Sequence, residues 1–183
     1  MTPRRQGRVA LGVALCWMAL GALGLARGSE SGDAQSALEA AISKAKAERK
    51  IVLVEFGASY CGWCRNFAQF FRSEPTKKVV DSHFVVVELA VQEPDGRSTP
   101  GADELLKSWG GADSGLPFLA FVSSSGNKVA DSNAMPGGGN IGYPVDPDEI
   151  EAFMGVLDRA GARLSEAERS TLVAYLQKTP EKR

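Results

Sequence analysis

Short apolar runs rich in β-branched residues alternate along the chain with longer segments in which apolar residues recur every three or four positions. The first pattern is typical of strands buried on both faces, and the second of amphipathic helices. The predicted strands are 51–56, 84–91, 118–122 and, across a hairpin turn at 124–127, 128–131. Four predicted helices lie at 34–50, 103–109, 146–161 and 165–176. A further helix begins at the cysteine motif 61–64 and is predicted to be broken or kinked at Pro75.

The order of these elements predicts the fold class. A strand, the cysteine-headed helix and a second strand follow one another in the first half of the chain, which predicts a parallel βαβ unit, and the later hairpin adds an antiparallel pair. Asp146 and Ser165 each stand three residues before a glutamate, and such capping boxes mark the starts of the last two helices. The sequence therefore predicts one α/β domain with a central mixed sheet flanked by helices. The glycine-rich stretch 133–143 is predicted to be a flexible loop.

The N-terminal segment 1–28 is predicted to be a signal peptide. Three arginines precede an uncharged apolar stretch at 9–25, and 26–28 offers small residues for cleavage. A retained membrane anchor is the alternative, because the apolar stretch is at the lower limit for spanning a bilayer. Cys16 belongs to this segment. The predicted organisation is a cleavable signal followed by a domain at 29–183, which places the mature protein in the periplasm or outside the cell.

Charge and cysteine content limit the kinds of function that the sequence supports. Without residues 1–28 the chain loses four arginines and keeps 17 basic and 22 acidic residues, so no basic surface indicates a nucleic-acid partner. Two cysteines remain, Cys61 and Cys64, and a cross-link between residues so close in the chain closes almost no loop. A structural disulfide framework would close longer loops, so this pair is better explained by reactivity.

The place of Cys61 predicts its chemistry. It follows a buried strand and begins a helix, where free backbone N–H groups and the positive end of the helix dipole stabilise a thiolate. Cys64 lies one helical turn further on, within bonding distance but shielded. Cys61 is therefore the predicted nucleophile of disulfide exchange, and Cys64 the resolving thiol.

A metal site is the competing interpretation of the two cysteines. Structural zinc takes four ligands, and the mature chain adds only His83, which is predicted to lie at the surface or at a strand end. The count therefore favours a redox pair and no metal. Copper handling by the two soft thiolates alone stays open.

A strand followed by Cys-x-x-Cys and a helix resembles the thioredoxin family, and the likeness extends beyond the cysteines. Glu55 stands six residues before Cys61, where thioredoxins carry a buried carboxylate that is thought to move the proton of the resolving cysteine. Pro117 opens a later strand, where the family has a cis-proline packed against the redox pair. The segment 56–64 is similar to secreted bacterial thioredoxin-like proteins, including the periplasmic domains of thiol:disulfide interchange proteins. The likeness covers 34–157.

The resemblance implies a thioredoxin fold with an extra C-terminal helix, and a thiol–disulfide oxidoreductase that acts on protein thiols and disulfides outside the cytoplasm. It implies no cofactor, a membrane redox partner and a monomer. The catalytic candidates are Cys61, Cys64, Glu55 and Pro117, and the substrate-binding candidates are Tyr60, Gly62, Trp63 and Leu116. The alternative is a thioredoxin-fold module that binds a metal or a substrate without turnover, such as a copper chaperone.

Several residues depart from the thioredoxin pattern. Trp63 replaces the proline between the cysteines, and it either contacts substrate or covers the disulfide. Glu88 stands where thioredoxin has a lysine near the buried carboxylate, and two inward-facing acids would raise the pKa of one of them. Glu55 could instead face solvent at the end of its strand. The loop 135–144 goes beyond the minimal fold. The direction of electron flow is therefore not predicted.

Overall fold

The computed structural model describes residues 32–178, so the predicted signal peptide 1–28 and the first residues of the predicted domain lie outside the described part of the chain. The helices are α1 Ala34–Glu48, α2 Gly62–Arg72, α3 Thr76–His83, α4 Ala102–Ser108, α5 Pro147–Arg159 and α6 Glu166–Leu176. The strands are β1 Ile51–Gly57, β2 Phe84–Ala90, β3 Phe118–Val122 and β4 Lys128–Asp131. Among residues 32–178, none of the helices has the length and apolar character that a membrane span requires.

The four strands form one mixed sheet in the order β2-β1-β3-β4. β1 pairs in parallel with β2 and antiparallel with β3, and β3 pairs antiparallel with β4. β1 and β3 have a neighbour on each side, and because helices pack on both faces of the sheet their continuous apolar runs are buried on both faces. The predicted mixed sheet and its strands are therefore confirmed.

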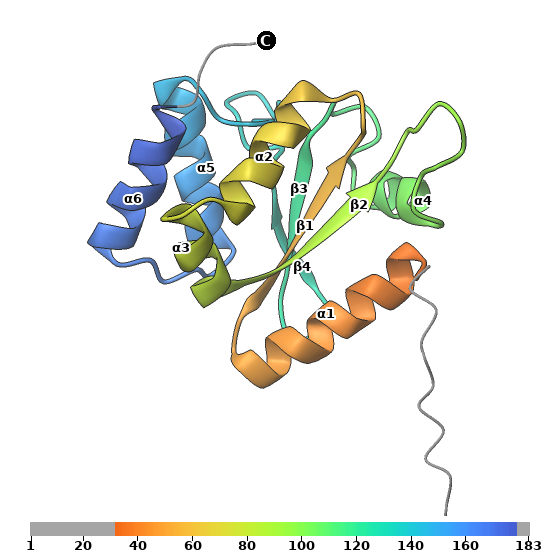
Figure 1. Ribbon diagram of the computed structural model, residues 1–183, viewed down its shortest axis with the longest axis horizontal. Coiled ribbons are helices and arrows are strands. Elements are labelled where there is room, and N and C mark those ends of the chain that lie inside the picture. The colour runs from red at the N-terminus through yellow and green to blue at the C-terminus, as the bar shows by residue number, and fades with distance from the viewer. Residues whose placement is uncertain (1–31, 179–183) are drawn as a thin grey trace, which may run out of the picture. The chain divides into compact units, whose positions relative to one another are not determined.

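Helices cover both faces of the sheet and divide the core into two apolar layers. One layer joins α1 and α4 to the face of β1 that carries Val52, Val54 and Phe56. The other joins α2, α3, α5 and α6 to the opposite face, which carries Leu53. Figure 1 shows the first pair of helices on one side of the strands and the other four on the opposite side. The extra C-terminal helix, α6, is confirmed and belongs to the larger layer.

Helix α3 is the element that the sequence analysis did not include. α2 ends at Arg72, and after Pro75 the chain starts a second helix instead of leading directly into β2. The buried Thr76 hydroxyl supports this start by donating to the backbone oxygens of Phe70 (2.5 Å) and Ser73 (2.7 Å). Both predicted capping boxes, at α5 and α6, are present.

A glycine between α4 and β3 yields a prediction about stability. A Cβ at Gly111 would overlap Leu106 and lie 2.8 Å from Cδ1 of Phe118, two fully buried side chains. Gly111→Ala should therefore lower the free energy of unfolding by about 2 kcal/mol through overpacking. Gly155→Ala is the matched control, because inside α5 its Cβ meets only the end of the Arg159 side chain at 3.4 Å, and it should raise the same quantity by about 0.5–1 kcal/mol. Urea unfolding curves measure both changes, and equal effects of the two substitutions would contradict the packing at Gly111.

Candidate active site

The two cysteines of the motif are joined by a disulfide at the start of α2, with their Cα atoms 5.3 Å apart. Cys61 is the N-cap residue of this helix, and its Sγ accepts the backbone N–H of Cys64 at 3.0 Å. Cys64 is buried inside the first turn, whereas Cys61 is partly exposed. A thiolate from outside therefore reaches Cys61 more easily than Cys64, as the predicted roles of nucleophile and resolving thiol require.

Glu55 is buried beside this pair. Only 5% of its surface is exposed, so the alternative that it faces solvent is wrong. A Cβ placed on Gly57 would lie 2.6 Å from Oε1 of Glu55 and 3.1 Å from Cβ of Cys64. The carboxyl and the second cysteine thus border the same space beside Gly57, and only a glycine leaves that space open. Within the described part of the chain, Oε1 of Glu55 has no hydrogen-bond partner.

Burial and neighbouring charges set the proton affinity of Glu55. Its pKa is raised from 4.5 to about 8, chiefly by burial and also by the negative charge of Glu88, while the positive charge of Arg72 acts in the opposite direction. Glu88 lies directly opposite Glu55 in the β1–β2 register. The condition that both acids face inward is not met, because Glu88 has 38% of its side chain exposed and pairs with Arg72 of α2. Neutral pH is therefore close to the pKa of Glu55, so its carboxyl can both lose and accept a proton.

The predicted cis-proline lies at the start of β3. The Leu116–Pro117 peptide bond is cis, Pro117 is buried, and Leu116 is partly buried against the layer beside α1 and α4. The β1–β3 register pairs Phe56 with Phe118. The end of β1 that leads to the cysteines therefore lies beside the start of β3 that carries the proline.

Asn140 fixes the backbone around this proline, and the sequence analysis did not identify it. Its Nδ2 donates to the carbonyl oxygens of Gly115 (3.1 Å) and Pro117 (3.0 Å). Its Oδ1 accepts from the Ser132 hydroxyl at 2.7 Å, and that hydroxyl in turn accepts the backbone N–H of Leu119 at 2.9 Å. The glycine-rich loop thus holds the proline turn in place.

Tyr143 brings the other end of the same loop to the cysteine motif. Its ring is buried, stacks on the Trp63 indole with centroids 5.9 Å apart, and meets the Phe67 ring edge-on at 4.8 Å. One face of Trp63 is therefore covered by protein. The loop was predicted to be flexible, but Ile141 and Tyr143 are buried and hold it against the domain. These two apolar residues, so close together in a glycine-rich stretch, were the sequence signal that could have indicated a loop packed against the domain.

The remaining substrate-binding candidates differ in accessibility. Tyr60, immediately before Cys61, has 59% of its surface exposed, and Gly62 is also exposed. Both lie where a protein substrate would approach Cys61. Their role in binding stays a prediction.

His83 does not join the cysteines. It closes α3 and makes a hydrogen bond of 3.0 Å with Glu168 of α6. Among residues 32–178, no group of three or more histidine, cysteine or acidic side chains is placed to hold a metal ion.

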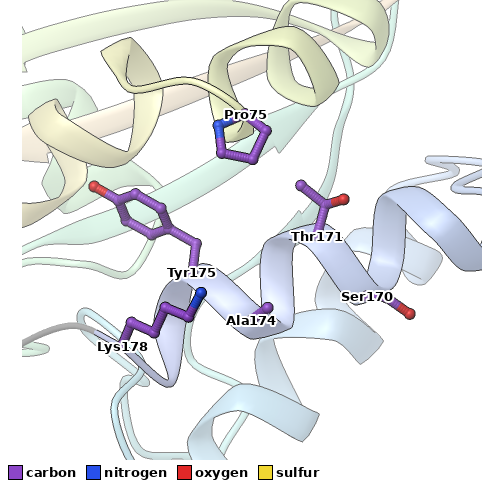
Figure 2. A pocket seen from close by; sticks show the side chains of 6 residues that line it. All are labelled: Pro75, Ser170, Thr171, Ala174, Tyr175 and Lys178. Carbon is purple, nitrogen blue, oxygen red and sulfur yellow. The ribbon is translucent and has the colours of Figure 1, made fainter.

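A pocket elsewhere on the domain lies between the start of α3 and the last turns of α6 (Figure 2). Its lining residues are Pro75, Ser170, Thr171, Ala174, Tyr175 and Lys178. None of them belongs to the cysteine motif or to the proline turn. The pocket is therefore separate from the candidate active site at the start of α2.

A family model and several solved structures are similar to this chain. A family model described as thioredoxin-like matches residues 33–124. Among solved structures, the chain is similar to a disulphide isomerase from Xylella fastidiosa Temecula1, with 22% identity, a TM-score of 0.50, and coverage of 86% of this chain and 98% of that one. It also matches a DsbH oxidoreductase, with 22% identity, a TM-score of 0.47 and coverage of 72% and 84%. The comparison with functionally curated proteins found no match. The similarity to the structure from Xylella fastidiosa supports the fold described above.

The raised pKa of Glu55 predicts how stability depends on pH. Between its usual pKa of 4.5 and about 8 the folded protein keeps a proton that the unfolded chain has lost, so the free energy of unfolding falls as the pH rises through this range. Glu55→Gln keeps the shape and removes the ionisation. At pH 9 it should raise the free energy of unfolding of the oxidised protein by up to about 5 kcal/mol, with little change at pH 4.

Urea unfolding from pH 4 to pH 9 measures this difference. Glu88→Gln is the control, because it removes an exposed neighbouring charge and should leave most of the pH dependence in place. Parallel pH profiles of the Glu55→Gln variant and the wild type would contradict a buried, protonated Glu55.

Proposed function

Because the chain belongs to the thioredoxin-like family, we propose that it is a thiol–disulfide oxidoreductase that exchanges disulfides with protein substrates through Cys61 and Cys64. One observation carries the proposal. The two cysteines are bonded across the first turn of a helix, with the accessible sulfur at the helix N-cap and the shielded one against a buried carboxyl. Reactive thiolates are stabilised at such helix starts.

The reaction proceeds in two exchanges of sulfur–sulfur bonds. The Cys61 thiolate attacks a substrate disulfide, so that a bond from Cys61 to one substrate sulfur forms and the other substrate sulfur leaves as a thiolate. Cys64 then attacks Cys61, which forms the Cys61–Cys64 disulfide and releases the second substrate sulfur. Two electrons pass from the protein to the substrate. The same steps in reverse oxidise a substrate dithiol.

Glu55 supplies the proton acceptor that the second step needs. Cys64 must lose a proton before it can attack, and it is buried away from water. The carboxylate form of Glu55 beside Cys64 takes this proton, and its pKa of about 8 makes it a stronger base than an ordinary carboxylate at neutral pH. In the reverse direction the protonated carboxyl returns the proton to the leaving Cys64 thiolate.

We place this activity outside the cytoplasm, in the periplasm or secreted. The support is the sequence of residues 1–28, with its arginines, apolar stretch and small residues at the end. A thiol–disulfide exchanger there needs a redox partner in the membrane, which supplies electrons to a reductant or removes them from an oxidant. The direction follows from the reduction potential of the Cys61–Cys64 couple, where about −270 mV indicates a reductant and about −120 mV an oxidant.

Removal of the resolving thiol tests the proposal. Cys64→Ala should stop the reaction after the first step, because no second thiol can release the substrate from Cys61. Incubation of this variant with a disulfide-containing protein such as insulin should give a mixed disulfide that dithiothreitol cleaves, detected by mass spectrometry after non-reducing electrophoresis. Most of the accessible Cys61 should be trapped.

The double variant Cys61→Ala/Cys64→Ala is the matched control and should trap nothing. The alternative of a copper-binding module makes the opposite prediction. Absence of adducts with Cys64→Ala, together with tight Cu(I) binding by the wild type, would overturn the proposed exchange reaction in favour of metal handling.

A further inference from the structure

The turn that leads into Cys61 is held by an acid from a distant loop. Both backbone and side chain of Ser59 donate to the Glu93 carboxylate, the N–H to Oε1 at 2.6 Å and the hydroxyl to Oε2 at 2.7 Å. The carbonyl oxygen of Ser59 accepts from the Arg65 guanidinium at 3.2 Å. The next turn is closed by the Cys61 N–H, which donates to Ala58 at 3.0 Å. Ser59 is thus fixed at all three of its hydrogen-bonding groups, two residues before the nucleophile.

The position of Glu93 is itself determined by its surroundings. The preceding residue, Gln92, has a φ of +56°, in the left-handed region that residues other than glycine rarely adopt. Its N–H donates to Oδ1 of Asp103 at 2.9 Å, and the N–H of Glu93 donates to the Ser98 hydroxyl at 3.1 Å. A strained conformation persists only where neighbouring contacts hold it, and such conformations gather at functional sites. Here the contacts aim the Glu93 carboxylate at Ser59.

These contacts matter most when the disulfide is open. In the oxidised protein the bond to Cys64 fixes the Cys61 sulfur by itself. After reduction the sulfur keeps only its hydrogen bond from the Cys64 N–H, and that bond forms only while Cys61 stays at the N-cap of α2. The end of β1 is itself fixed, since the Gly57 carbonyl oxygen accepts the Val91 N–H at 2.8 Å. Between this point and Cys61, the side-chain hydrogen bonds that hold the backbone converge on Ser59.

We propose that Glu93 is a positioning residue for the nucleophile, which holds Ser59 so that the reduced Cys61 sulfur stays at the helix N-terminus. The inference rests on the proposed thiol–disulfide exchange at Cys61. Three charged side chains make contacts around the motif, namely Glu55 of β1 beside Cys64, and Arg65 of α2 and Glu93 at Ser59. A purely electrostatic role of Glu93 would act on the thiolate through charge, and a positioning role acts through the two hydrogen bonds.

Two substitutions of Glu93 separate these roles. Glu93→Gln removes the charge but keeps both bonds, because its amide oxygen can accept the Ser59 N–H and its amide nitrogen can donate to the Ser59 hydroxyl. Glu93→Ala removes the charge and both bonds. The measurement is the rate at which iodoacetamide alkylates Cys61 in the reduced full-length protein as a function of pH, followed on the Cys61 peptide by mass spectrometry.

The expected result is a midpoint of alkylation about one pH unit higher in Glu93→Ala than in Glu93→Gln. Below both midpoints this difference is about tenfold in the thiolate fraction and in the rate. Charge removal alone affects both variants equally, so coincident midpoints for the two variants would overturn the proposal. The reduction potential against glutathione, measured in parallel, should also differ between them.

Ser59→Ala provides the second variant in case Glu93→Ala does not fold, which circular dichroism reveals. It removes one of the two bonds and leaves the Glu93 charge unchanged. Positioning predicts a higher alkylation midpoint than in the wild type, and an unchanged midpoint would contradict it. A wild type that does not exchange disulfides with glutathione would instead overturn the proposed function, and the alkylation comparison would still decide the role of Glu93.

Discussion

The close approach of a carboxyl and a cysteine at the end of β1 is the constraint on which the site depends. Glu55 and Cys64 both border the space that a side chain of Gly57 would fill, so the strand must end in a glycine for both to lie there. The carboxyl stays out of water because β1 is central in the sheet and has an apolar layer on each face. The fold therefore keeps one ionisable group buried, and this cost is tolerated where proton transfer to a thiol is useful.

The sequence predicted the elements whose signals are local. The continuous apolar run of β1 and the capping boxes of α5 and α6 are such signals, and each was found where expected. Helix α3 was missed because it is only eight residues long and begins directly after a proline, and its three buried side chains are too few to establish a helical period. Its start depends on Thr76, whose hydroxyl reaches back to the end of α2, a contact that no local pattern indicates.

The residues of the candidate site also divide into those that a local sequence pattern indicates and those that only the tertiary fold brings to the site. Cys61, Cys64, Glu55 and Pro117 lie at recognisable spacings from a strand or helix end, and the structure brings their elements together. Asn140, Tyr143 and Glu93 contact the site across 23 to 80 residues of chain, so their roles depend on the tertiary fold. Strand register alone does not predict whether a side chain is buried. Glu88 lies opposite Glu55, and yet its side chain turns outward to Arg72.

The place of the cysteines between the sheet centre and its loops has a consequence for local unfolding. β1 and β3 are buried and paired on both sides, so their amides belong to the part of the molecule that exchanges hydrogen only when the whole domain opens. The loop tip at 137–139 is exposed and contributes few backbone bonds, which places it at the fast-exchanging end of the scale. The disulfide lies between these two regions, shortly after β1 and beside Trp63, which stacks on Tyr143 at the end of the loop. Amides at the loop tip should therefore exchange while the strand that leads to the nucleophile stays protected.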